Sequence, residues 1–102
     1  TGAAAARAGR QARARVARAA LRVGLINYRL GRRADAAEAL KQARDQLAKL
    51  VVDFPTVPQY RFDLAGTYTK RGLLHYDAGE WKAAEQEARQ GVAMLEKLTN
   101  DI

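Results

Sequence analysis

The sequence holds few residues that could do chemistry, and these lack the partners that a reaction centre needs. His75 is the only histidine and cysteine is absent, so a metal site would need several carboxylates on neighbouring helix turns. Asp35 with Glu38, and Glu85 with Glu87, have the residue types of an acid–base pair. Charges at helix starts and on solvated faces are far commoner. We expect a non-enzyme without cofactor or metal, in which His75 is a packing residue.

A block of positive charge is the strongest chemical signal. The net charge is +7, yet residues 1–33 hold nine arginines and no acid, whereas residues 34–102 carry nine basic and eleven acidic side chains. Such a block attracts polyanions, and contacts to phosphates weaken steeply with added salt. Tyr28 is the only stacking aromatic in the segment, and no base-reading motif is present. Nucleic-acid or other polyanion binding is therefore the alternative function, behind a protein or peptide partner.

Composition and hydrophobic spacing predict an all-α fold. Alanine is abundant and there are only two prolines, which favours helix. The pattern predicts four main helices, at about residues 11–30, 34–52, 57–78 and 81–98. Gly31 and Gly79 end the first and third helices. Pro55 stops the second helix, and Thr56 with Gln59 has the form of a capping box for the third.

The helix faces predict how these elements are used. On the first helix, an apolar face recurs at spacings of three and four: Val16, Ala19, Val23, Ile26 and Leu30. A separate stripe holds Arg15, Arg18, Arg22 and Arg29, with Leu21, Leu25 and Tyr28 beside it. Inward positions of the third helix are expected at Tyr60, Leu64, Tyr68, Gly72 and Tyr76. Trp81 is expected to anchor the packing of the fourth helix, whose apolar stripe is Ala84, Ala88, Gly91, Leu95 and Leu98.

The chain contains an internal repeat. A shift of 48 positions pairs Gly24 with Gly72 and Gly31 with Gly79. The same shift also aligns Leu25 with Leu73, Tyr28 with Tyr76, Ala36 with Ala84, Leu47 with Leu95 and Leu50 with Leu98. Matches at both glycines, the tyrosine and the apolar ladder indicate two copies of one helix–turn–helix unit.

The spacing Gly-x6-Gly-x4-Ala-x6-small, present as Gly24/Gly31/Ala36/Ala43 and Gly72/Gly79/Ala84/Gly91, resembles the tetratricopeptide repeat. Residues 53–65, with the following Gly72-Leu73-Leu74, are similar to long-period repeats attached to bacterial signalling proteins, including serine/threonine kinases. The resemblance implies two tandem antiparallel hairpins of a right-handed α-solenoid in one domain. Repeat one would cover about 12–53, repeat two about 57–99, and residues 1–11 would form a basic extension.

In that family the first helix of each repeat lines a concave groove. Carried over by register, and with Arg22 added from the arginine stripe, the resemblance implies these partner-binding residues: Arg18, Leu21, Arg22, Leu25, Tyr28, Arg29, Thr69, Leu73 and Tyr76. Leucine, tyrosine and arginine together suit a peptide or helix with acidic side chains. We therefore expect a protein–protein interaction or scaffolding module.

Two further expectations concern assembly and location. Two repeats are fewer than the three that a solenoid usually needs, so the chain belongs to a larger repeat array or an exposed apolar end face forms a homo-oligomer. A purely structural self-assembly role is a further alternative. No apolar run approaches the roughly 18 residues of a membrane span, and cysteine is absent. We expect a cytoplasmic protein with no membrane partner.

Overall fold

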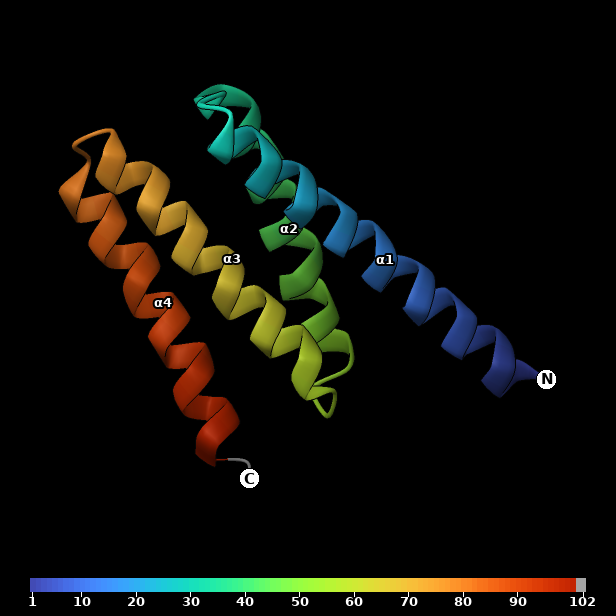
Figure 1. The fold of residues 1–102 in the computed structure, drawn as a ribbon. Coiled ribbons are helices and arrows are strands. Elements are labelled where there is room, and N and C mark those ends of the chain that lie inside the picture. The colour runs from blue at the N-terminus through green and yellow to red at the C-terminus, as the bar shows by residue number, and fades with distance from the viewer. Residues whose placement is uncertain (101–102) are drawn as a thin grey trace.

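The computed structural model describes residues 1–100, which form two antiparallel helical hairpins joined by a short corner (Figure 1). The four helices are α1 (Gly2–Arg29), α2 (Arg33–Asp53), α3 (Pro58–Asp77) and α4 (Trp81–Asn100). The described residues contain no strand. The prediction of an all-α chain with four main helices is therefore confirmed.

The two hairpin bends share one geometry. Gly31 and Gly79 have φ of 74° and 77°, in the left-handed region where glycine carries no Cβ penalty. In the first bend the amide of Arg32 donates to the carbonyl of Asn27 at 2.9 Å, and in the second the amide of Glu80 donates to that of His75 at 2.9 Å. These pairs are 48 positions apart, so the repeat read from the sequence is a structural repeat as well.

Two helix starts differ from the sequence-based prediction. Helix α1 begins at Gly2 rather than at residue 11, because the alanine-rich segment is itself a strong helix former and Thr1 caps it by accepting from the Ala4 amide at 3.2 Å. The capping box at Thr56 is not formed. Val57 is the N-cap of α3 and makes no side-chain bond, while Pro58 lies in the first turn, where its missing N–H costs nothing.

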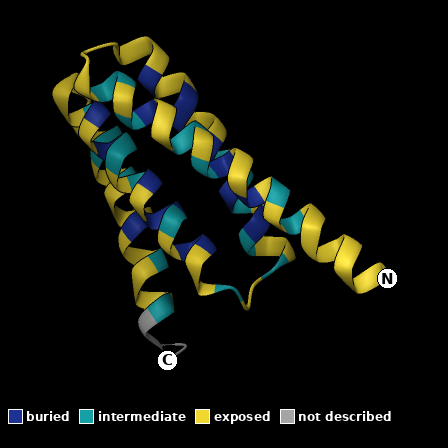
Figure 2. Ribbon diagram, turned by 45° about the vertical axis from the view of Figure 1, so that its right-hand side comes forward, coloured by how far each residue is buried: buried dark blue, intermediate teal, exposed yellow. Residues whose placement is uncertain are grey.

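Helix α2 is the central helix. It packs against α1 on one side and α3 on the other, and six of its residues are buried: Ala36, Ala39, Leu40, Ala43, Leu47 and Leu50. Leu40 packs with Leu74 of α3 in one cluster. Leu47 and Leu50 pack with Leu64 in another, beside Ala14 and Ala17 of α1. Figure 2 shows this buried layer between the hairpins and the exposed N-terminal end of α1.

Small residues let the helices approach closely. A Cβ added to Gly24 of α1 would lie 2.6 Å from Cδ2 of the fully buried Leu40, and one on Gly91 of α4 would lie 3.3 Å from the carbonyl oxygen of Ala65. These two glycines therefore stand where one helix crosses another. The expectation that Gly91 marks a close helix contact is confirmed.

Helix α4 is attached on one side only. Within the described residues it packs against α3 and against no other helix, and Gly91 is the only one of its residues 81–98 that is buried. Arg71 of α3 and Glu87 of α4 form an ion pair across this contact. Met94 packs against the core, and most of the other described side chains of α4 face outward.

The structure corrects two packing predictions and locates the apolar face of α1. Tyr76 and Trp81 were expected to pack inward but are about 60% exposed, since no described helix covers the outer side of α3 and α4. The buried face of α1 consists of small residues, Ala14, Ala17 and Gly24, which allow the close contact with α2. Its larger apolar residues lie on another face and are exposed: Val16, Val23, Ile26 and Leu30.

Candidate protein-interaction surface

A mostly apolar groove runs along the outer side of the second hairpin, between α3 and α4. It encloses about 550 Å³. Its α3 wall holds Thr69, Gly72, Leu73 and Tyr76, and its α4 wall holds Trp81, Ala84, Glu85, Ala88, Gly91, Val92 and Leu95. Glu85 is the only charged residue among them. A groove of this composition suits the apolar face of a helix.

The shape of the groove follows from the small residues at its floor. Gly72 and Gly91 are buried at the contact between the two helices, so the backbones come close and the larger side chains stand on either side. At one end the rings of Tyr76 and Trp81 meet edge to face, with centroids 4.8 Å apart and an interplanar angle of 78°. Both aromatic rings remain half exposed or more, so they are available to a partner.

The first hairpin has the same groove, and there it is filled. Subtracting 48 from the eleven groove positions gives Leu21, Gly24, Leu25, Tyr28, Arg33, Ala36, Ala37, Leu40, Ala43, Arg44 and Leu47. Leu74 of α3 packs onto Leu40 there, and Leu64 of α3 packs with Leu47. Helix α3 is thus the occupant of the first groove, and the second groove has none among the described residues.

The partner-binding residues predicted from the sequence fall into two groups. Three of them, Thr69, Leu73 and Tyr76, lie on the wall of the open groove. The other six lie on α1, where Leu21 and Tyr28 pack beside the buried contact with α3. The structure therefore does not place all nine residues along one open groove.

Two of the α1 residues are engaged within the molecule. Arg18 donates to the carboxylate of Asp63 at 3.3 Å, and the Tyr28 hydroxyl donates to that of Asp77 at 2.9 Å. The hydrogen bond to Asp77 raises the pKa of Tyr28 above its ordinary value, because it stabilises the protonated phenol. Both contacts tie α1 to α3, so these side chains hold the two hairpins together.

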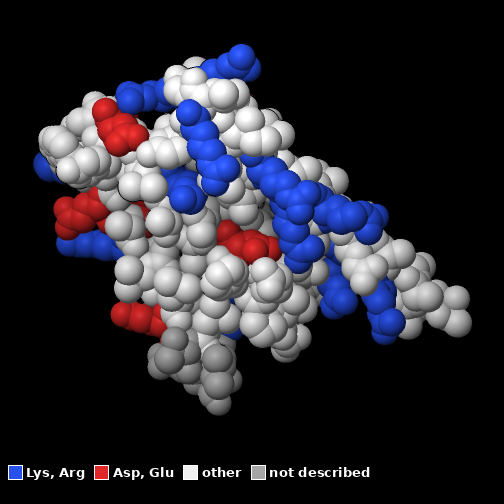
Figure 3. Space-filling view, viewed as in Figure 1, with Lys and Arg blue, Asp and Glu red and all other residues white. Residues whose placement is uncertain are grey.

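Three other arginines of α1 are open to solvent. Arg15, Arg22 and Arg29 are exposed at a spacing of seven, which places them in one line along the helix. None of the three forms an ion pair with a described residue. Figure 3 shows the basic side chains gathered along α1, with most of the visible acidic ones toward α3 and α4. The basic and acidic side chains that are separated along the sequence are therefore also separated on this face of the molecule.

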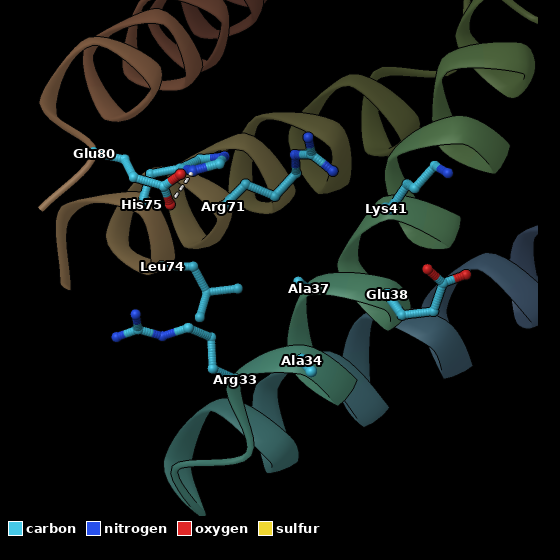
Figure 4. Close-up of a pocket in the computed structure, with 9 residues that line it drawn as sticks. All are labelled: Arg33, Ala34, Ala37, Glu38, Lys41, Arg71, Leu74, His75 and Glu80. Atoms are coloured by element: carbon cyan, nitrogen blue, oxygen red, sulfur yellow. Dashed lines mark hydrogen bonds and ion pairs between the residues drawn. The ribbon is translucent and has the colours of Figure 1, made fainter. Parts of the chain in front are cut away.

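A second cavity, of about 330 Å³, lies where the start of α2 meets the end of α3 (Figure 4). Its side chains carry both signs of charge: Arg33, Glu38 and Lys41 come from α2, Arg71 and His75 from α3, with Glu80 at the bend. Nδ1 of His75 lies 3.3 Å from Oε1 of Glu80. No group of three or more metal-ligating side chains occurs among the described residues.

None of the seven groove residues on α4 was foreseen as a contact residue: Trp81, Ala84, Glu85, Ala88, Gly91, Val92 and Leu95. Four of them, Ala84, Ala88, Gly91 and Leu95, were assigned to the packing stripe of the fourth helix, and Trp81 to its anchor. One feature of the sequence could have indicated a contact surface here. The apolar stripe of the fourth helix is as long as that of the second, yet the sequence predicts no later helix in the chain to cover it.

No known protein family, curated sequence or solved structure matches this chain. The tetratricopeptide resemblance thus stays a prediction. No described helix is long and apolar enough to cross a membrane.

Proposed function

We propose that this chain is a tetratricopeptide-like, non-enzymatic protein-interaction module that receives an amphipathic helix in the α3–α4 groove. One observation carries the proposal: the equivalent groove of the first hairpin already holds a helix. Several positions of that groove recur in the open one, with leucine at 25/73 and 47/95, tyrosine at 28/76 and glycine at 24/72, while Ala88 stands where the first groove has Leu40. The same floor and walls are expected to accept the same kind of ligand.

The physical driving force is burial of apolar surface. Leu73, Trp81 and Val92 are each substantially exposed, and covering a large apolar side chain contributes about 1.5–3 kcal/mol. Trp81 and Tyr76 are of the residue types that dominate binding energy at interfaces. The occupant should therefore present leucine-like side chains at helical spacing, with few charges facing the groove.

Trp81 gives a direct test, because it is the only tryptophan and lies in the groove. An amphipathic helical peptide with three leucines at positions i, i+3 and i+7 should shift the Trp81 emission to shorter wavelength as it covers the ring. A peptide of the same composition with scrambled order is the control. Leu73→Glu should weaken binding at least tenfold, whereas Val52→Glu, at an exposed residue of α2, should leave it unchanged. Equal responses to both peptides would refute the proposal.

A second candidate function rests on a different observation, the line of unpaired arginines on α1. An acidic peptide is the partner that this line suits, since guanidinium groups bind carboxylates with paired hydrogen bonds. Arg22→Glu with Arg29→Glu should abolish such binding while helicity stays intact, because neither residue forms an ion pair with a described residue. Parallel titrations with duplex DNA at two salt concentrations separate the classes: preference for DNA with a steep salt dependence would favour polyanion binding instead.

A further inference from the structure

Two surfaces hold nearly all of the exposed large apolar side chains. Eleven such residues occur in the described chain. Five lie in the α3–α4 groove: Leu73, Tyr76, Trp81, Val92 and Leu95. Four more lie on the exposed face of α1, which we call the α1 stripe: Val16, Val23, Ile26 and Leu30. Only Val52 and Phe62 fall outside both, so the exposed apolar surface is concentrated in these two places.

The α1 stripe corresponds by register to the docking face of α3. Adding 48 to its positions gives Leu64, Arg71, Leu74 and Ala78. Leu64 and Leu74 are the residues through which α3 packs onto Leu47 and Leu40 of the first groove. Val16 and Ile26 of the stripe are thus apolar at the two positions that α3 uses for docking, and both are exposed.

The molecule therefore carries both halves of its own internal interface. The groove half lies between α3 and α4, and the helix half is the α1 stripe. Inside the chain, the same two halves meet where α3 docks onto the first hairpin. The stripe is even more apolar than its counterpart, because Val23 stands where α3 has Arg71.

We propose that the occupant of the groove is α1 of a second copy of this chain, which docks head to tail as α3 docks onto the first hairpin. This inference rests on the proposed function of the groove. Charge favours the arrangement, since the incoming segment, residues 1–33, has nine arginines and no acid, whereas residues 34–102 have a net charge of −2. Within the chain, Asp77 of α3 meets Tyr28 of α1. A shift of 48 positions turns this pair into Arg29 of the incoming copy and Tyr76 of the receiving copy. The added helix would therefore bring Arg29 to Tyr76 and to its neighbour Asp77.

Such a contact joins two different surfaces and therefore does not close on itself. Each added copy exposes a new groove, so assembly continues by the same step. The mean mass in solution should rise with concentration beyond that of a dimer. A contact between two grooves, by contrast, would stop at two copies.

Sedimentation velocity on the full chain and three variants tests this arrangement. Ile26→Glu blocks the stripe, Val92→Glu blocks the groove, and Val52→Glu is the matched control on exposed apolar surface outside both. We expect the parent chain and Val52→Glu to form species that grow with concentration. Each blocked variant alone should be monomeric. Their equimolar mixture should form a dimer and stop there, because one free stripe and one free groove remain.

Other results would overturn the inference. A parent chain that is monomeric at every concentration would contradict it. An Ile26→Glu variant that still dimerises would also contradict it, because it would indicate contact between two grooves. Loss of association in Val52→Glu would mark non-specific aggregation. Absence of a dimer in the mixture would show that stripe and groove are not partners. Circular dichroism must show unchanged helicity, and Val23→Lys and Leu73→Glu repeat the test at both surfaces if a first variant unfolds.

Failure of this inference can be told from failure of the proposed function. The Ile26→Glu chain keeps an intact groove and is titrated with the amphipathic peptide. A blue shift of the Trp81 emission together with a monomeric parent chain would keep the groove as a helix site and reject the second copy as its occupant. No shift in that chain would reject both.

Discussion

Arg71 of α3 holds Glu87 of α4 through two hydrogen bonds, from Nε to Oε2 at 3.1 Å and from Nη2 to Oε1 at 3.0 Å. Both side chains are largely shielded, at 17% and 14% exposure. Since α4 contacts only α3 among the described helices, this pair is a main polar link between α4 and the rest of the molecule.

Breaking this pair should loosen the second hairpin. Arg71→Ala leaves Glu87 shielded and without its partner, and hydrogen bonds to charged groups contribute about 1.5–3 kcal/mol. We expect a loss of that size in the free energy of unfolding, measured by urea denaturation followed by circular dichroism. Arg89→Ala is the control, because Arg89 pairs with Glu85 on the exposed surface of α4 and should cost under about 0.5 kcal/mol. Equal losses in both variants would contradict the role given to Arg71.

Two glycine substitutions should have opposite effects. Gly24→Ala places a methyl group 2.6 Å from Cδ2 of Leu40, which is fully buried, so overpacking should cost about 1–3 kcal/mol. Gly66→Ala on α3 meets no atom within 4 Å and should stabilise by about 0.5–1 kcal/mol through helix propensity. Thermal unfolding of the two variants, measured against the parent chain, checks both signs. A stabilising Gly24→Ala would mean that α1 and α2 are less closely packed than described.

The phenol of Tyr28 should titrate at higher pH than an ordinary tyrosine. Its hydrogen bond to Asp77 raises its pKa in the folded state above the value of about 10 that holds for the unfolded chain. The contribution to stability is therefore complete below about pH 10 and is lost as pH rises through the folded-state pKa.

The difference between the alkaline absorbance titrations of the parent chain and Tyr28→Phe isolates this one phenol. In an Asp77→Ala background the midpoint should return toward about 10. A midpoint that does not depend on Asp77 would show that the bond is absent in solution.

The first two turns of α1 should exchange their amide hydrogens faster than any other part of that helix. Residues 2–9 are all exposed, whereas Ala14 and Ala17 are buried against the core. Local opening costs least where few apolar contacts are lost. Hydrogen exchange followed by mass spectrometry measures this gradient, and uniform protection along α1 would show that residues 2–9 have a partner.

Local signals in the sequence were enough to predict the helices and bends. Gly31 and Gly79 supply the left-handed residue that a tight bend between helices requires, and the first turn of α3 accommodates Pro58. These features depend on a few neighbouring residues, so they can be read without the fold. The capping box at Thr56 failed because a shift of the helix start by one residue gives the cap to Val57.

The packing of α1 could not be read in the same way. Val16, Val23 and Ile26 make the larger apolar face, yet α1 packs through Ala14, Ala17 and Gly24, because only small residues let it reach the groove beside Leu40. Which face is buried is thus decided by the shape of α2, which lies elsewhere in the chain. The open groove was only partly foreseen for the same reason. Trp81 and Val92 are exposed because no described helix other than α3 packs against α4, and the local sequence does not carry that information.

The one-sided attachment of α4 has a consequence for how folding and recognition relate. Helix α2 packs against helices on two sides, whereas α4 packs against one. A ligand in the groove would give α4 a second packing surface, so the free energy of binding would also stabilise the folded state of α4. Helix α4 should then melt late when the site is occupied and early when it is empty. Occupancy of the groove would thus control the lifetime of the C-terminal hairpin as well as the choice of partner.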